Sequence, residues 1–257
     1  SRAPKKNLPP LAFMIFDLTD KALDALIIKI TQLTVFENGE TELQHHFFNN
    51  EDREISADAF AHHHITAEEL KDKPKVTSFD FNVAKNIVVW DGQVTRSILA
   101  KNNITKNPPI INMHSLARYL EDTPKPIRLN DYALKANPKK RNQIEFQLKK
   151  AEKKIHVLPE IFEHLKSQYS EKYTENSPSF LVSVGKCRTK KLAMEAIKTY
   201  LAKRAEIQKN KPSQRGNKKH VKPQQQTTAD KKVIVVNTTL SQNNQGVKAV
   251  VVKKRAK

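Results

Sequence analysis

Apolar and polar residues alternate in short blocks along the first fifty residues, in the pattern of strands separated by turns. Leu11–Phe16 is a continuous apolar run followed by Asp17, which is typical of a buried strand with a carboxylate at its carboxyl end. Ala25–Phe36 and Glu42–Phe48 have the composition of two further strands. Asn38-Gly39 lies between them and favours a tight hairpin turn. The pattern therefore predicts three strands with an antiparallel hairpin.

Helical segments follow and alternate with two short strands. Thr66 and Glu69 form a capping box at the start of one short helix. Asn86–Trp90 and Ile110–Asn112 are apolar runs of strand length. Helices are expected at Ser56–His62, Thr66–Lys71, Val94–Asn102, Ser115–Leu120, Leu129–Ala136 and across Ile144–Tyr169.

The last of these stretches has a clear apolar face. Its apolar residues recur every three or four positions, at Ile155, Leu158, Ile161, Phe162 and Leu165. Pro159 lacks an amide proton and should begin a new helix or kink the old one. Strands first, then helices alternating with strands, predict an α/β fold with a mixed sheet.

A smaller unit is expected after a linker at Ser170–Pro178. It would consist of a strand at Phe180–Val184, a basic turn at Gly185–Lys191 and a helix at Leu192–Ile207. The expected organisation is a core domain at 1–169, a small basic strand–helix extension at 178–207 and a basic tail at 208–257.

The tail has two kinds of sequence. Gln208–Asp230 has the Lys, Gln, Pro and Asn composition of a disordered linker. Val233–Val236 and Val247–Val252 are β-rich and suited to pairing as a hairpin.

Charge indicates a polyanionic partner. The chain has 46 Lys and Arg against 27 Asp and Glu, a net charge of +19, and most of the excess lies beyond Lys203. Such a distribution is typical of proteins that neutralise phosphates. Cys187 is the single cysteine, which excludes an internal disulfide and a four-thiolate metal site. Ser1–Pro10 does not have the pattern of a signal peptide and no apolar run is long enough to span a bilayer, so a cytoplasmic protein without a membrane partner is expected.

Four segments carry a resemblance to a known family. Ile15–Asp24 matches a strand running into a D-x-E motif, and Ile55–Pro74 matches an A-x-x-x-H-G-I-T-x-E-x-L-x-x-x-P segment through Ile65-Thr66 and Pro74. Val88–Leu99 corresponds to V-x-x-H-N-x-x-F-D-x-x-x-L, and Gln147–Glu152 to H-x-x-x-x-D. Across Leu11–Lys166 the chain thus resembles the DnaQ-like superfamily of DEDD-type 3′→5′ exonucleases, which includes ribonuclease T. The resemblance implies a ribonuclease H-like mixed sheet flanked by helices.

The family motifs are incomplete in this chain. In the family, four carboxylates hold two divalent metal ions and a histidine acts as general base. The resemblance implies that Asp17 and Glu152 keep two ligand positions. Two other ligand positions and the base have become Thr19, Thr95 and Gln147. Two carboxylates are too few for a well-held magnesium ion, so a non-catalytic pseudoenzyme without a cofactor is expected.

Three functions stay open at this point. The first is a non-catalytic protein that binds RNA or DNA, as part of a ribonucleoprotein or another nucleic-acid complex. The second is an active, divergent 3′→5′ exonuclease that uses Mg²⁺ or Mn²⁺ on Asp17, Asp20, Asp91 and Glu152. The third is an interaction scaffold in which the hairpin segment of the tail adds strands to a protein partner. The candidate nucleic-acid-binding residues are Lys186, Arg188, Lys190, Lys191, Lys203, Arg204, Lys218, Lys219, Lys253, Lys254 and Arg255.

Overall fold

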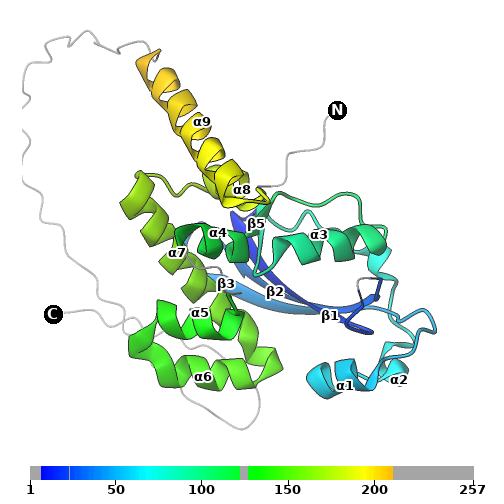
Figure 1. Cartoon of the computed structure of the whole chain (residues 1–257). Helices are drawn as coiled ribbons and strands as arrows, with labels where there is room; N and C mark the ends of the chain where they lie inside the picture. The colour runs from blue at the N-terminus through cyan, green and yellow to red at the C-terminus, as the bar shows by residue number, and fades with distance from the viewer. Residues whose placement is uncertain (1–6, 23, 122–126, 211–257) are drawn as a thin grey trace, which may run out of the picture. The chain divides into compact units, whose positions relative to one another are not determined.

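The computed structural model describes residues 7–22, 24–121 and 127–210. Within them the chain forms a five-stranded sheet in the order β3-β2-β1-β4-β5, with helices on both faces (Figure 1). The disordered linker and the hairpin expected in the tail lie outside the described residues. The strands are β1 (Leu11–Leu18), β2 (Ile27–Val35), β3 (Thr41–Phe47), β4 (Asn86–Val89) and β5 (Ile110–Asn112).

The strand directions are mixed. β1, β2 and β3 are antiparallel neighbours, whereas β4 runs parallel to β1 and β5 runs parallel to β4. The hairpin turn forms where Asn38-Gly39 predicted it: Gly39 has a φ of 84° and its N–H donates to the carbonyl of Phe36 at 3.0 Å. The predicted ribonuclease H-like α/β sheet, with its antiparallel hairpin and parallel β4, is therefore confirmed.

The described part of the chain contains twelve helical segments, some of which begin at the signals in the sequence. The capping box of Thr66 and Glu69 is present at α2, and Pro159 lies in the first turn of α7, where a new helix begins. The segments in the described part of the chain are α1 (Ala57–His63), α2 (Ala67–Leu70), η1 (Val76–Ser78), α3 (Gly92–Lys101), α4 (Met113–Leu120), α5 (Leu129–Ala136), η2 (Pro138–Lys140), α6 (Arg141–Lys149), η3 (Ala151–His156), α7 (Val157–Tyr173), α8 (Pro178–Gly185) and α9 (Lys190–Lys209), where η marks a 3₁₀-helix.

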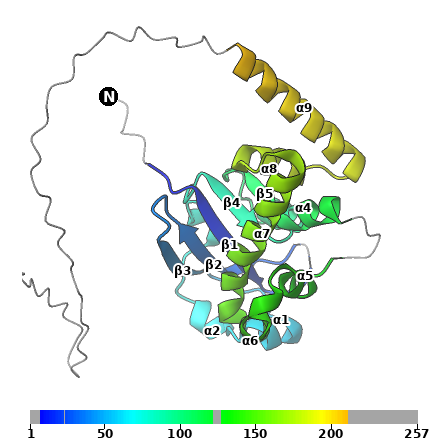
Figure 2. The same cartoon turned by 90° about the vertical axis from the view of Figure 1, so that its left-hand side faces the viewer.

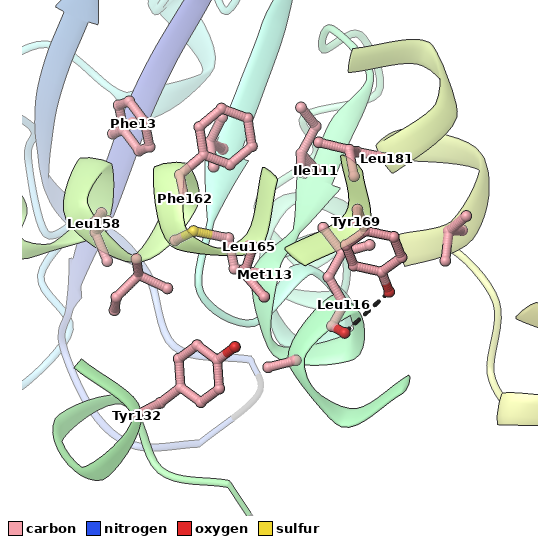
Figure 3. Packing of buried hydrophobic residues seen from close by; sticks show 14 of the residues in the cluster. Phe13, Ile111, Met113, Leu116, Tyr132, Leu158, Phe162, Leu165, Tyr169 and Leu181 are labelled. Atoms are coloured by element: carbon pink, nitrogen blue, oxygen red, sulfur yellow. Dashed lines mark hydrogen bonds between the residues drawn. The ribbon is translucent and has the colours of Figure 1, made fainter. Parts of the chain in front are cut away.

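The two faces of the sheet bury different clusters. On one face, Phe13 meets Phe162 of α7 edge to face, with ring centroids 5.7 Å apart, and Tyr169 donates its hydroxyl to the carbonyl of Leu116 at 3.0 Å (Figure 3). On the other face, Met14 packs with the α3 residues Ile98 and Leu99. The apolar face predicted from the 3–4-residue spacing is buried along α7.

The strand predicted at Phe180–Val184 is wrong, because this segment lies in helix α8. An apolar run of five residues fits a strand or a buried helix equally well, and the neighbouring contacts decide between them. Phe180, Leu181 and Val184 are fully buried in the same cluster as Phe13. Helix α8 and the first half of α9 thus pack against this cluster, through Ala193 and Ile197 in the case of α9.

Candidate nucleic-acid interface

Asp17 lies at the carboxyl end of β1, where the sheet register shifts, and its carboxylate faces lysines. It is opposite Lys29 of β2, and the Lys29 Nζ lies 3.9 Å from its Oδ2. Both side chains are largely buried. Lys154 of η3 also interacts electrostatically with Asp17. Burial lowers the pKa of Lys154, and the Asp17 carboxylate raises it. Asp17 is thereby matched by cationic side chains from two other elements.

Of the other carboxylates of the alternative metal site, two accept backbone N–H groups and one is exposed. Asp91 caps α3, and its Oδ1 accepts the N–H groups of Gln93 and Val94 at 3.0 Å each. Asp20 is exposed and accepts the N–H of the next residue at 2.7 Å. Glu152 is exposed on η3.

These residues do not fit a two-metal centre. Within the described ranges, no three His, Cys, Asp or Glu side chains are grouped closely enough to hold a metal ion. Asp17 instead faces Lys29, whose ammonium would repel a divalent cation.

Of the three positions that depart from the motif, Thr19 and Thr95 form hydrogen bonds with nearby backbone groups, and Gln147 lies on helix α6. Thr19 is buried, and its Oγ1 accepts the N–H of Leu26 at 3.0 Å. Thr95 is also buried, and its hydroxyl donates to the carbonyl of Asp91 at 2.7 Å within α3. Gln147 is half-buried on α6. Since both threonines satisfy nearby backbone groups, they do not form an open catalytic surface with Asp17.

His63 holds the turn after α1 against the end of β1. Its Nδ1 accepts the N–H of Ile65 at 3.0 Å, so its Nε2 carries the proton and donates to the carbonyl of Leu18 at 3.2 Å. Burial lowers the pKa of His63, although Asp17 acts in the opposite direction. The neutral imidazole therefore has a structural role.

Lowering the pH from neutrality to about 5 is expected to destabilise the fold, in part through His63. An unfolded histidine titrates near its ordinary pKa of about 6.5. Because the folded pKa of His63 is lower, the unfolded state takes up the proton first, and stability falls as the pH drops through this window. Melting temperatures across the window should fall less steeply for His63→Gln than for the control His62→Gln, which changes an exposed residue. Parallel curves for the two variants would contradict this role.

Two exposed phenylalanine rings carry lysine side chains above them, and together they define what we term the aromatic–lysine surface. Phe47 of β3 is 37% exposed, and the Lys29 Nζ lies 5.4 Å from its ring centroid. Phe146 of α6 is 49% exposed, and the Nζ atoms of Lys150 and Lys153 lie 5.0 Å and 4.7 Å from its centroid. Cations over aromatic faces are attracted by the ring quadrupole.

The segment around Phe146 is strongly basic. Between Pro138 and Lys154 the sequence has seven basic residues and two acidic ones, Glu145 and Glu152. Glu145 is paired with Arg141 at 2.8 Å. The basic residues are Lys139, Lys140, Arg141, Lys149, Lys150, Lys153 and Lys154.

A second cationic region is a groove between α3, α8 and α9, with a volume of ≈ 1220 Å³. Lys186 and Arg188 of the predicted basic turn line it together with Arg96 of α3. Its floor and walls include Ile110, Val182, Cys187, Leu192, Glu195 and Ala196. Burial raises the pKa of the Cys187 thiol, with the nearby Lys186 acting in the opposite direction. The thiol donates to the carbonyl of Ser183 at 3.4 Å, which favours an ordinary packed cysteine.

The other predicted binding residues are dispersed. Lys190 and Lys191 lie in the first turn of α9. Lys203 lines a shallow pocket near the far end of α9, and Arg204 forms an ion pair with the buried Glu175. The structure therefore gathers Lys186 and Arg188 in one groove but not the whole set. Lys218, Lys219, Lys253, Lys254 and Arg255 lie outside the described residues.

Sequence reasoning missed the aromatic–lysine surface. The signal for it was present as Phe146 followed by Lys149, Lys150, Lys153 and Lys154, an aromatic residue beside a basic run at helical spacing. The position of Lys29 over Phe47 required the β2–β3 register.

The fold and site together define an α/β protein with a ribonuclease H-like sheet and two cationic surfaces. No protein-family model matches the sequence, and no curated protein matches it. Among solved structures, the chain is similar to exonuclease X in complex with 5′ overhanging duplex DNA, with a TM-score of 0.38 and 22% identity over 50% of this chain and 73% of that chain. None of the described helices combines the length and apolar character needed to cross a membrane.

Proposed function

We propose that this chain is a non-catalytic nucleic-acid-binding protein whose main contact in the folded body is the aromatic–lysine surface. The observation that carries the proposal is the pairing of exposed Phe47 and Phe146 with Lys29, Lys150 and Lys153. A base stacked on an exposed ring contributes about 1–3 kcal/mol. Lys150 and Lys153 beside the Phe146 ring would neutralise the flanking phosphates. Lys29 is largely buried beside Asp17 and instead packs over the Phe47 ring.

The two rings belong to neighbouring parts of the fold. The segment η3 packs against α6, which carries Phe146, and against β1 and β2. It supplies Lys153 to the Phe146 ring, and Lys29 of β2 lies over the Phe47 ring. A single strand of nucleic acid that follows η3 would meet cations along its path.

The chemistry around Asp17 supports the non-catalytic part of the proposal. Divalent metal ions bind groups of oxygen ligands, and here the Asp17 carboxylate lies 3.9 Å from the Lys29 ammonium and interacts electrostatically with Lys154. These ammonium groups supply positive charge to the carboxylate without a metal ion. They do not activate water as metal ions do.

The basic groove between α3, α8 and α9 is proposed as a second contact for the phosphate backbone. Arg96, Lys186 and Arg188 provide its positive charge, and Glu195 is the acidic residue in its lining. Two separated cationic surfaces suit a longer ligand, in keeping with a role within a ribonucleoprotein or another nucleic-acid complex.

The Phe146→Ala variant tests the proposal. It is expected to weaken binding of a labelled single-stranded oligonucleotide about 5- to 150-fold, because removing a stacking ring costs about 1–3 kcal/mol. Fluorescence anisotropy measures the dissociation constant. The matched control is Phe60→Ala on α1, which removes a ring that is 42% exposed and faces His64.

Equal losses in the two variants would remove the proposed role of Phe146, provided that both keep the parental melting temperature. The same mixtures, supplied with Mg²⁺ or Mn²⁺, should contain intact oligonucleotide after incubation. Metal-dependent release of mononucleotides that is lost in Asp17→Asn would instead establish the exonuclease alternative.

A further inference from the structure

The outer edge of β3 has no strand partner among the described residues. β3 is the terminal strand of the sheet, and in the described part of the chain its outer side pairs with no strand (Figure 2). Phe48 donates its N–H to Ile28, and Phe36 donates to Glu40, so the even-numbered residues of this strand direct their backbone groups toward β2. The alternation leaves the N–H and C=O groups of Thr41, Leu43, His45 and Phe47 directed outward.

β3 has few of the features that commonly protect an edge strand. Protected edges have charged side chains, lysine above all, or proline, a bulge or very few residues. The one formally charged side chain of β3 is Glu42. β3 has seven residues in unbroken register with β2 and contains neither lysine nor proline. Leu43 is 40% exposed and Phe47 is 37% exposed on the same face of the strand. Such an edge is suited to pairing with another extended strand.

We propose that this edge pairs with β3 of a second copy of the chain, antiparallel and centred on Gln44. This register uses all four outward-directed residues, because Thr41 faces Phe47 and Leu43 faces His45 in both directions. Glu42, the single formally charged residue of β3, faces His46, so no like charges oppose each other. The strand is therefore complementary to itself.

The pairing extends the sheet without covering its faces. A two-fold axis through Gln44 and perpendicular to the sheet joins two five-stranded sheets and keeps corresponding faces on the same side. The Phe47 rings of both copies then lie on one side of the joined sheet, and pairing through the backbone leaves the contact of Phe47 with Lys29 in place.

Cross-linking tests both the dimer and its register. In a Cys187→Ser background, Gln44→Cys places two thiols opposite each other in a non-hydrogen-bonded pair, whose Cα separation of about 4.5 Å suits a disulfide. Mild oxidation should give a covalent dimer. The matched control Glu42→Cys should stay uncross-linked, since its symmetry mate is four residues away along the partner strand. Sedimentation velocity of the unmodified chain should show a dimer, and Leu43→Lys should raise its dissociation constant about tenfold or more.

Two outcomes would overturn the proposal even if every variant folds. One is a chain that stays monomeric at all concentrations, which would leave the edge to a different partner. The other is cross-linking of Glu42→Cys as fast as Gln44→Cys. A dimer that appears only after oligonucleotide is added would also overturn it, because the ligand would then be what joins the copies.

Discussion

Removing residues 212–257 is expected to weaken nucleic-acid binding more than any single substitution in the folded body. The segment contains eleven Lys and Arg residues and one Asp. If six to eight of these charges meet phosphates, the logarithm of affinity should fall against the logarithm of salt concentration with a slope of roughly −4 to −7. The truncated chain should bind at least tenfold more weakly in moderate salt and should show a much flatter slope.

A salt titration of RNA and DNA binding, with the full and truncated chains side by side, measures both quantities. The melting temperature provides the control. It should stay nearly unchanged, because the described hydrophobic clusters are built from residues between Leu11 and Leu201. Neutralising Lys186 and Arg188 in the groove should add a smaller loss, as separate sites combine additively. Equal affinity and slope for the two chains would exclude the tail as a binding element and favour the scaffold function.

Phe162→Ala is expected to cost about 3–5 kcal/mol of stability, because it removes a fully buried aromatic ring. Phe162 is 1% exposed and lies edge to face with Phe13 at the centre of the cluster beneath α7. Truncation leaves a cavity that the rigid sheet fills poorly. The melting temperature should fall by roughly 6–20 °C for a folded unit of this size.

Thermal unfolding followed by circular dichroism measures this loss, and Phe60→Ala on the surface serves as the control. Phe162→Leu, which leaves a smaller cavity, should fall between the parent and Phe162→Ala. A change in Phe162→Ala no greater than that in Phe60→Ala would mean that α7 is not fixed to the sheet by this contact. If Phe162→Ala does not fold, the melting temperature of Phe162→Leu relative to the parent still tests the prediction.

Features that depend on neighbouring residues could be predicted from the amino-acid sequence alone. The hairpin at Asn38-Gly39 followed from backbone sterics, the start of α2 from the capping box of Thr66, and the division before α7 from Pro159. The mixed sheet also followed, because apolar runs of strand length and helical periodicity are local patterns.

Features that depend on contacts between distant segments could be read from the folded structure but not from the local sequence. The apolar run Phe180–Val184 became a helix because it is buried against the core cluster, while its local sequence fits either element. The contact of Lys29 with Asp17 depends on the register of β1 and β2, and the approach of Lys154 depends on where η3 packs. The open edge of β3 likewise follows from strand order, which is set by contacts between distant segments.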